Sequence, residues 1–351
     1  MGGLLDVLTR SDYILRGDLE SFEDQIAKFI GAKHVIGVGN GTDAIWLSLI
    51  AAGIKPGDEV IVPSHTYIAT ADAIKIIGAT PVLVDCDEDH SIAVEAIQLN
   101  ITKKTTAVIA VNLNGRAASL IEIKKICEEQ GLTLIEDNAQ GLGARIGGQS
   151  TGTFGIAGTL SFFPAKILGC LGDGGAIVTN NSEFAEKLKM LRNHGRDSSG
   201  EVVTWGLNSR LDNIQANILS SKLPYLGESI QLRREFAKLY DEGLSDLKSL
   251  KLPKPPTEET QNYDTFQNYE IEAQNRDMLR EFLRTRGIGT ILPWAGKAIH
   301  QFGLEGVRKT NLRKTEELFS KVALLPMNQY LTIDDITYVI SQIREFYDKK
   351  I

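Results

Sequence analysis

The chain has 351 residues, of which 42% are hydrophobic and 24% charged, and its formal net charge is −7. This length is typical of a large domain joined to a smaller one, and the composition is ordinary for a globular enzyme. An acidic chain is a poor nonspecific partner for nucleic acid or an anionic membrane, and no apolar run approaches the roughly 20 residues that span a bilayer, so we expect a cytoplasmic protein that binds neither.

The first half of the chain alternates between helical and strand patterns. Apolar residues recur at helical spacing in residues 18–52, which predicts two helices there. Further strands and helices follow in turn. The expected strands are 59–63, 81–85, 107–111 and 132–136, and the expected helices are 68–77, 91–98 (with Ser91 as N-cap) and 119–130. This alternation predicts an α/β layer on a mostly parallel sheet.

The second half begins with residues 138–158, which are rich in glycine and lack periodicity, so we expect a functional loop there. Two strands follow at 159–163 and 176–179, then helices from 182 to 247 with a break near 193–209, and a linker at 251–260. The expected later elements are strands near 266–271 and 288–292 and helices at 276–286, 311–320 and 332–348. We therefore expect a large domain at 1–247 and a small α+β domain at 248–351.

Lys166 follows a short apolar strand and precedes the glycine-rich run Gly169–Gly175. A lysine at the end of a buried strand is poorly explained as a solvated surface charge. Lysine amines form Schiff bases with carbonyl substrates and with pyridoxal 5'-phosphate (PLP), and desolvation or a nearby cation lowers the pKa of the amine into a useful range. We expect Lys166 to be kept for carbonyl chemistry.

Three further features fall at strand ends or helix starts of the same layer. Gly41-Thr42 opens a helix, with Thr42 as its cap, whose N-terminus suits a phosphate. Asp137 ends a strand and could hold a protonated pyridine nitrogen, and Tyr67 could stack on a flat ring. Taken one at a time, each feature has a better structural explanation. Gly41-Thr42 would be an ordinary helix start, Asp137 would cap a turn, and Tyr67 would be packed in the core. With Lys166, and with Ser161 as a phosphate contact, they supply the parts of a PLP site.

A metal site is not expected. The three cysteines are widely spaced and form no C-x-x-C pair, which also argues against a disulfide framework. The five histidines are dispersed, with no pair four residues apart.

The chain resembles the DegT/DnrJ/EryC1/StrS family of PLP-dependent nucleotide-sugar aminotransferases, which have the aspartate-aminotransferase (type I) fold. The resemblance covers nearly the whole chain, and its most specific part is Ser161–Gly175. The matching blocks are Ser11–Phe22, Val38–Leu47, Pro56–Thr70, Glu136–Gly143, Ser161–Asn180, Arg192–Gly195 and Gly206–Gln215.

This resemblance implies a role for each site residue. Lys166 is expected to form the Schiff base with PLP and to move a proton between carbons of the cofactor and the substrate. Asp137 is expected to pair with the pyridinium nitrogen, Gln140 to lie beside the 3-hydroxyl and Tyr67 to stack on the ring. The implied phosphate contacts are Gly41, Thr42, Ser161 and, from a neighbouring subunit, Asn208. A homodimer with shared active sites is therefore implied.

The chain departs from the family pattern in segments that tend to line the sugar and nucleotide pockets. Asn114 stands where relatives often carry an aromatic residue, and Arg116 replaces a commoner uncharged one. Residues 291–300 differ from a His-Tyr-x-x-Pro-like pattern, and residues 196–205 lack an expected Tyr and His. The candidate substrate residues are Asn114, Arg116, His194, Trp294 and His300.

The implied reaction moves an amino group from L-glutamate to a nucleotide-linked keto sugar, with a dTDP-linked 3- or 4-keto-6-deoxyhexose as the first expectation. Such a reaction belongs to the biosynthesis of amino sugars for surface polysaccharides, glycans or natural products. The alternatives are a UDP- or GDP-keto sugar, a cyclitol, or a non-catalytic PLP-binding regulator. Without PLP, the fallback is an α/β ligand-binding protein. Lys166 argues against a dehydrating subgroup of the family, which has histidine at this position.

Overall fold

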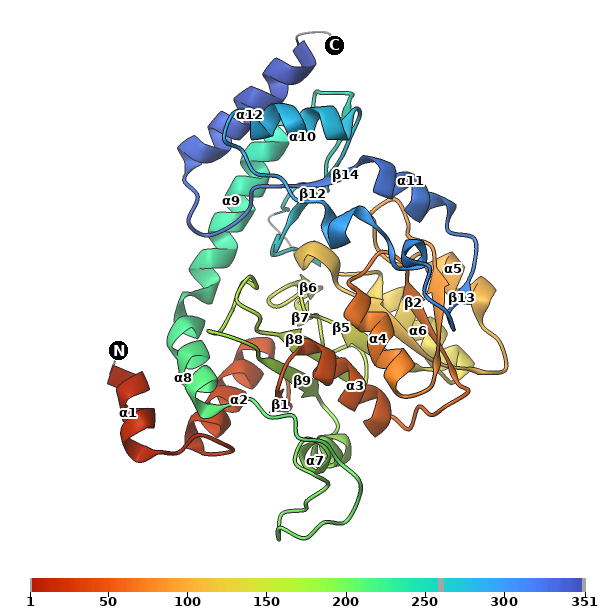
Figure 1. Ribbon diagram of the computed structural model, residues 1–351, viewed down its shortest axis with the longest axis vertical. Helices are drawn as coiled ribbons and strands as arrows, with labels where there is room; N and C mark the ends of the chain where they lie inside the picture. The colour runs from red at the N-terminus through yellow and green to blue at the C-terminus, as the bar shows by residue number, and fades with distance from the viewer. Residues whose placement is uncertain (1, 258–261, 349–351) are drawn as a thin grey trace.

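The computed structural model describes residues 2–257 and 262–348, and Figure 1 presents their arrangement. Within these residues the largest sheet has the strand order β1-β9-β8-β5-β4-β2-β3-β13. Neighbours from β8 to β13 are parallel, whereas β9 is antiparallel to both β1 and β8. The strands are β1 (His34–Val38), β2 (Glu59–Pro63), β3 (Thr80–Val84), β4 (Thr105–Val111), β5 (Thr133–Asp137), β8 (Ala157–Ser161), β9 (Gly175–Thr179) and β13 (Arg308–Lys309). The predicted mostly parallel sheet is confirmed.

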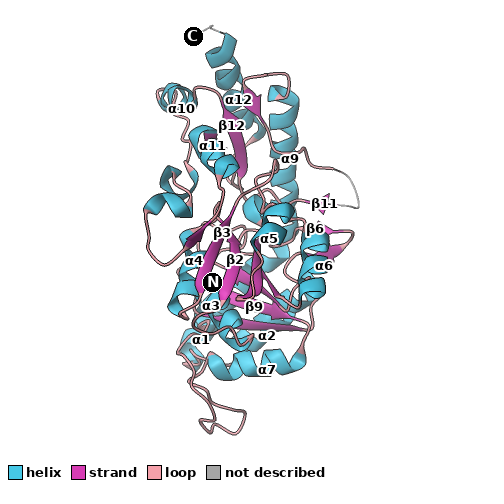
Figure 2. Cartoon of the chain, turned by 90° about the vertical axis from the view of Figure 1, so that its right-hand side faces the viewer, coloured by secondary structure: helices cyan, strands magenta, loops and turns pink. Residues whose placement is uncertain are grey.

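Helices cover both faces of this sheet. Along β2, Val60 and Val62 join the core on one face and Ile61 joins the core on the other, and all three are fully buried. Figure 2 shows α3 and α4 on one side of the central strands and α5 and α6 on the other. Burial on both faces explains why these strands have continuous apolar sequences.

The helices of the N-terminal part are α1 (Gly2–Arg10), α2 (Gly17–Ile30), α3 (Gly41–Ala51), α4 (Ile68–Ile76), α5 (Val94–Asn100), α6 (Leu120–Gln130), α7 (Ser182–Leu191) and α8 (Asn213–Lys222). No helix among the described residues is both long and apolar enough to cross a membrane. Within the same residues, no group of three or more His, Cys, Asp or Glu side chains is arranged to hold a metal ion.

The C-terminal part has a core of its own, in which a three-stranded antiparallel sheet packs against helices. Its elements are β10 (Leu250–Lys251), β12 (Tyr269–Ala273), β14 (Val322–Leu325), α10 (Arg276–Arg284), α11 (Arg313–Lys321), α12 (Ile333–Asp348) and the second half of α9 (Leu226–Leu244). In Figure 1, α9 runs from the large layer up to this sheet. The strands β11 (Asn262–Tyr263) and β13 pair instead with strands of the N-terminal part. A domain boundary after residue 247 stays a prediction.

Some elements differ from the expectations. The sequence patterns miss α1, β1, β14 and the hairpin of β6 (Arg145–Ile146) and β7 (Gln149–Ser150). The strand expected at 288–292 is wrong, because only Ile291 forms a bridge there, to Leu324. The N-cap expected at Ser91 is also wrong, since α5 begins at Val94 with Ala93 at its cap position. The N–H of Ser91 instead donates to Asp87 in the turn before the helix.

Candidate active site

A cavity of about 690 Å³ lies at the carboxyl ends of the central strands, the usual place for a ligand in an α/β sheet. The ends of β4, β5 and β8, the beginning of α3 and the turn before α4 contribute to its wall. The C-terminal part contributes the short helix η3 (Pro293–Gly296) to the wall. Among the predicted site residues, those that line the cavity are Gly41, Thr42, Tyr67, Asp137, Gln140, Ser161, Lys166 and Trp294.

Asp137 is held at the end of β5 by two hydrogen bonds. Its Oδ2 accepts from the hydroxyl of Thr70 at 2.7 Å, and its Oδ1 accepts from the N–H of Ala139 at 3.2 Å. Burial raises the pKa of Asp137, while these hydrogen bonds and the charge of Lys166 oppose the increase. A buried carboxylate of this kind is stabilised by a positively charged partner in the cavity. A protonated pyridine nitrogen is such a partner.

The neighbouring Glu136 has a different role, because successive side chains of a strand point to opposite faces. Its carboxylate accepts backbone N–H groups from Gly152, Phe154 and Gly155 at 2.6, 2.7 and 3.0 Å. Glu136 is fully buried. It therefore ties the glycine-rich loop to the sheet, while Asp137 faces the cavity.

Lys166 lies in the loop between β8 and β9, where its N–H donates to the carbonyl of Phe163 at 2.8 Å. Burial lowers the pKa of its amine, and the negative charge of Asp137 opposes this effect. A lowered pKa favours the neutral amine, which is the nucleophilic form. The site therefore pairs an amine suited to attack on a carbonyl with a carboxylate suited to hold a cation.

The beginning of α3 forms another wall of the cavity. The side chain of Asn40 accepts from the N–H of Asp43 at 2.8 Å, so Asn40 is the N-cap and the expectation for Thr42 as the cap is wrong. Thr42 instead lies in the first turn, whose N–H groups lack partners within the helix and can bind an anion. Gly41 lies against Ser161, since a Cβ on Gly41 would come within 2.9 Å of the Ser161 Cβ. Glycine thus allows the helix start and the end of β8 to meet.

Tyr67 and Gln140 lie on other sides of the cavity. The side chain of Tyr67 is 56% exposed, which rules out the alternative of a packed core aromatic. Its ring centroid is 5.6 Å from that of Trp294. The Oε1 atom of Gln140 accepts from the N–H of Asn114 at 2.7 Å. This bond fixes the orientation of the side-chain amide, so the amide nitrogen points away from Asn114.

The described lining of the cavity does not include the remaining predicted residues. Asn114 is buried and its side chain accepts from Asn268 at 2.9 Å, while Arg116 pairs with Asp264 at 3.2 Å. His300 contacts the hydroxyl of Ser64 at 2.7 Å. The other two, which are exposed and lie between α7 and α8, are His194 and Asn208.

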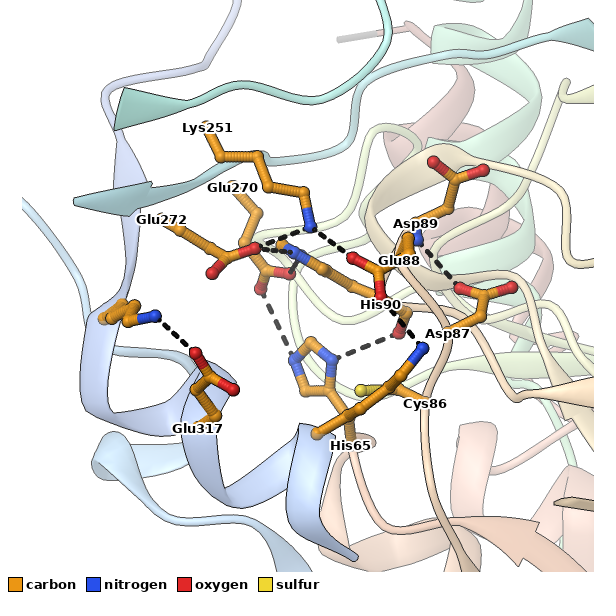
Figure 3. A network of polar contacts seen from close by, with 12 residues as sticks. His65, Cys86, Asp87, Glu88, Asp89, His90, Lys251, Glu270, Glu272 and Glu317 are labelled. Atoms are coloured by element: carbon orange, nitrogen blue, oxygen red, sulfur yellow. Dashed lines mark hydrogen bonds and ion pairs between the residues drawn. The ribbon is translucent and has the colours of Figure 1, made fainter. Parts of the chain in front are cut away.

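Figure 3 shows a polar network that joins the turn before α4 to the small sheet. His90 contacts Glu270 at 2.8 Å and Glu272 at 3.1 Å, and His65, two residues before Tyr67, lies 3.4 Å from Glu270. Burial alone would lower the pKa of His90, but the two glutamates raise it to about 9. His90 is therefore charged at neutral pH, and its ion pairs link β12 to the turn after β3. His65, which contacts both Glu270 and the carbonyl of His90, connects this network to the wall of the cavity that carries Tyr67.

Sequence reasoning missed the residues that hold the site together, such as Thr70 and Asn40. The signal for Asn40 was present, because Asn is a preferred N-cap and lies directly before Gly41. The only sequence signal for Thr70 was that it lies about one helical turn after Tyr67. Its bond to Asp137 joins residues 67 positions apart.

Comparisons with known proteins agree with this geometry. The sequence profile of the DegT/DnrJ/EryC1/StrS aminotransferase family matches residues 3–344. The chain is 40% identical to the "pleiotropic regulatory protein" of Geobacillus stearothermophilus, over 98% of this chain and 93% of the relative. It is 38% identical to the UDP-N-acetyl-3-dehydro-α-D-glucosamine 3-aminotransferase of Acidithiobacillus ferrooxidans, over 97% and 92%. It is 37% identical to the dTDP-3-amino-3,4,6-trideoxy-α-D-glucose transaminase of Streptomyces venezuelae, over 98% and 90%.

Solved structures give the same result. A DegT/DnrJ/EryC1/StrS aminotransferase from Brucella abortus superposes with a TM-score of 0.92 at 37% identity, covering 98% of this chain and 94% of that one. A protein from Bacillus subtilis with bound pyridoxamine phosphate superposes with a TM-score of 0.89 at 28% identity, covering 99% and 81%. The fold is therefore the type I aminotransferase fold. The chain belongs to the DegT/DnrJ/EryC1/StrS aminotransferase family and is a PLP-dependent aminotransferase.

Proposed function

We propose that the protein transfers an amino group from L-glutamate to a keto carbon of a nucleotide-linked sugar. The observation that carries this proposal is the pairing of a buried Asp137 with an amine of lowered pKa, Lys166, in one cavity. When bound, PLP supplies an aldehyde that reacts with amines and a ring that accepts electrons from the carbon next to the amine. The residues of the cavity match the chemical groups of this cofactor.

Each wall of the cavity has a task in this proposal. Lys166 holds the cofactor through its amine and, once displaced by the amino donor, takes and returns the proton that moves between carbons. Asp137 holds the proton on the ring nitrogen, and Thr70 fixes the orientation of its carboxylate. The N-terminus of α3 and Ser161 bind the phosphate, as their close approach at Gly41 suggests.

Gln140 and Tyr67 complete the cofactor site. Because the Gln140 carbonyl accepts from Asn114, its amide nitrogen can donate to the 3-oxygen of the ring. Tyr67 presents an exposed aromatic face for stacking, and Trp294 packs beside it at the mouth formed by the C-terminal part. The indole N–H of Trp294 is buried and has no partner among the described residues, so it is suited to donate to a sugar oxygen.

The names of the relatives support a nucleotide-linked substrate with its keto group at carbon 3. One is a 3-aminotransferase for a UDP-linked 3-dehydro sugar, and another is a transaminase for a dTDP-3-amino-trideoxyhexose. We propose a dTDP-linked 3-keto-6-deoxyhexose as the first substrate to test and a UDP-linked 3-keto sugar as the second. The reaction belongs to amino-sugar biosynthesis in the cytoplasm.

We also propose a homodimer in which Asn208 reaches the phosphate of the neighbouring subunit. The connection that carries Asn208 exposes large apolar side chains, with Trp205 95%, Val202 64% and Val203 57% exposed. Clustered apolar exposure of this kind marks a surface for association. Substitution of Asn208 by Ala would weaken cofactor binding in a dimer, whereas a fully active monomer would contradict this role.

The deciding experiment is an amino-transfer screen with L-glutamate as donor. The panel contains dTDP-3-keto-, dTDP-4-keto-, UDP-3-keto- and GDP-4-keto sugars, with formation of the amino sugar measured by mass spectrometry. We expect the fastest transfer to the dTDP-3-keto sugar and none in Lys166→Ala. The same screen tests the alternative of a non-catalytic regulator, which the name of the Geobacillus relative favours. A regulator would bind PLP and aminate no sugar.

A further inference from the structure

The segment Thr265–Asn268 joins β11 to β12 and passes close to two loops of the active site. The N–H of Thr265 donates to the carbonyl of Gly115 at 2.8 Å. The approach is so close that a Cβ on Gly115 would come within 2.5 Å of the Gln267 nitrogen. Gly115 also has a φ of +81°, which favours glycine. This segment is therefore a fixed part of the site's surroundings.

Gln267 uses its side-chain amide to hold the chain on both sides of Lys166. Its Oε1 accepts from the N–H of Ile167 at 2.7 Å, and its Nε2 donates to the carbonyl of Ala165 at 3.0 Å. Gln267 is only 6% exposed, so water competes little with either bond. The two peptide groups that flank Lys166 are thus fixed by one side chain about 100 positions along the chain.

The backbone of Gln267 is itself anchored from α9. Nη1 of Arg233, which is 2% exposed, lies 3.3 Å from the carbonyl of Phe266 and 3.0 Å from that of Gln267. The same guanidinium group contacts the carbonyl of Met327 at 3.1 Å. Burial lowers the pKa of Arg233 to about 10, so it still carries its charge at neutral pH. Hydrogen bonds from a charged donor are the stronger kind, and they make the base of the Gln267 side chain rigid.

We propose that Gln267 is a positioning residue that sets the path of the Lys166 loop and thereby aims the lysine amine at the reacting carbon. The inference deepens the proposed function and rests on the role given there to Lys166. An amide fits this task because it donates and accepts at once, and the two peptide groups offer one acceptor and one donor. The position of the lysine then depends on a segment that leads directly into β12 of the small sheet.

The test compares Gln267→Met with a matched control on the same loop. Met has a similar length but forms neither hydrogen bond, so it leaves the N–H of Ile167 and the carbonyl of Ala165 without partners. The control is Gln215→Met, because Gln215 accepts from the N–H of Leu171 at 2.9 Å and donates to its carbonyl at 3.1 Å. Both variants remove a paired amide clamp, and only one clamp flanks Lys166.

Two readouts follow the loop and the chemistry separately. In protein freed of cofactor, hydrogen–deuterium exchange at the Ile167 amide should be about ten-fold faster in Gln267→Met and unchanged in Gln215→Met. After PLP is added, the visible band of the lysine-bound cofactor should form about ten-fold more slowly. The kcat should fall about ten- to hundred-fold while KM for the sugar changes less than about two-fold, as misplacement of a reacting group predicts.

The proposal is overturned if Gln267→Met keeps the wild-type rate of band formation and the wild-type kcat, or if Gln215→Met loses both equally. If Gln267→Met does not fold, Gln267→Asn takes its place, because its shorter amide cannot reach both peptide groups. If the wild-type protein forms no lysine-bound band at all, the proposed function fails. The exchange rate at Ile167 still decides in that case whether Gln267 holds the loop.

Discussion

The floor of the cavity and its mouth are built in different ways. The floor consists of strand ends and one helix start of the large layer: Asp137 and Ser161 are the last residues of β5 and β8, and Gly41 is the first residue of α3. The mouth consists of irregular segments, among them η3, where Trp294 and Ala295 adopt positive φ angles of 53° and 57°. A regular scaffold thus fixes the shared chemistry, and the irregular mouth is free to vary with the substrate.

The largest expected effect comes from Lys166, in the loop that continues from the end of β8 at the floor. Lys166→Ala should lower kcat by at least about a thousand-fold, because it removes both the amine and the general acid–base group. The measurement is the rate of amino transfer from L-glutamate. Lys187→Ala is the control, since its amine donates to the carbonyl of Ala51 at the C-terminal end of α3, whereas the cavity lies at the N-terminal end. A Lys166→Ala enzyme with more than a tenth of wild-type activity would place the chemistry elsewhere.

The next prediction concerns Glu136, which lies next to Asp137 on β5 but faces away from the cavity. Glu136→Ala should lower the free energy of unfolding by about 3 kcal/mol or more, because it leaves several buried N–H groups without an acceptor. Urea unfolding of the cofactor-free protein measures this. Glu128→Ala on the exposed face of α6 should change it by less than about 0.5 kcal/mol. Equal effects would show that the Glu136 anchor is unimportant.

The junction between floor and mouth should respond to pH through His90. The pKa of His90 is raised from 6.5 to about 9 in the folded protein by Glu270 and Glu272, against the effect of burial. A raised pKa means that protonated His90 stabilises the fold, by about 3 kcal/mol. This contribution is complete below pH 6.5 and is lost as the pH rises through about 9.

The measurement is urea unfolding of wild type and His90→Gln between pH 6 and pH 10. The destabilisation caused by His90→Gln should be greatest at pH 6 and should shrink as the pH rises. A difference that is independent of pH would mean that the ion pairs of Figure 3 contribute no net stability.

The smallest expected effect belongs to the mouth. Trp294→Phe keeps an aromatic ring beside Tyr67 but removes the indole N–H, so KM for the nucleotide sugar should rise about five- to ten-fold, the loss of one hydrogen bond. The kcat and the spectrum of the bound cofactor should stay unchanged. A changed spectrum with an unchanged KM would assign Trp294 to the cofactor instead.

The same contrast explains what the sequence could predict. Strands buried on both faces, such as β2 and β4, have continuous apolar sequences, and the polar residues at their ends were recognisable as site candidates. The strand β1, which is as long as β2, was missed because Gly37 interrupts its apolar run, and β6 and β7 span only two residues each. β1 pairs with β9, and β6 pairs with β11, and local patterns do not record partners so far away in the sequence.

The sequence could not predict the positioning contacts, for a related reason. Gln267 and Arg233 form their bonds across long sequence separations, and a buried glutamine or arginine has no periodic signature of its own. Asn114 was expected at the substrate because it departs from the family pattern. In the structure its N–H donates to Gln140 and its side chain contacts Asn268, and with Arg116 it lines a neighbouring cavity of about 640 Å³, so its role at the substrate stays a prediction.

The most direct test of the central claim is to locate the lysine that carries the cofactor. The purified protein is incubated with PLP, reduced with borohydride and digested, and the modified peptide is sequenced by mass spectrometry. The account predicts a single stoichiometric modification at Lys166, abolished by prior incubation with L-glutamate. Modification at another lysine, or at none, would contradict it.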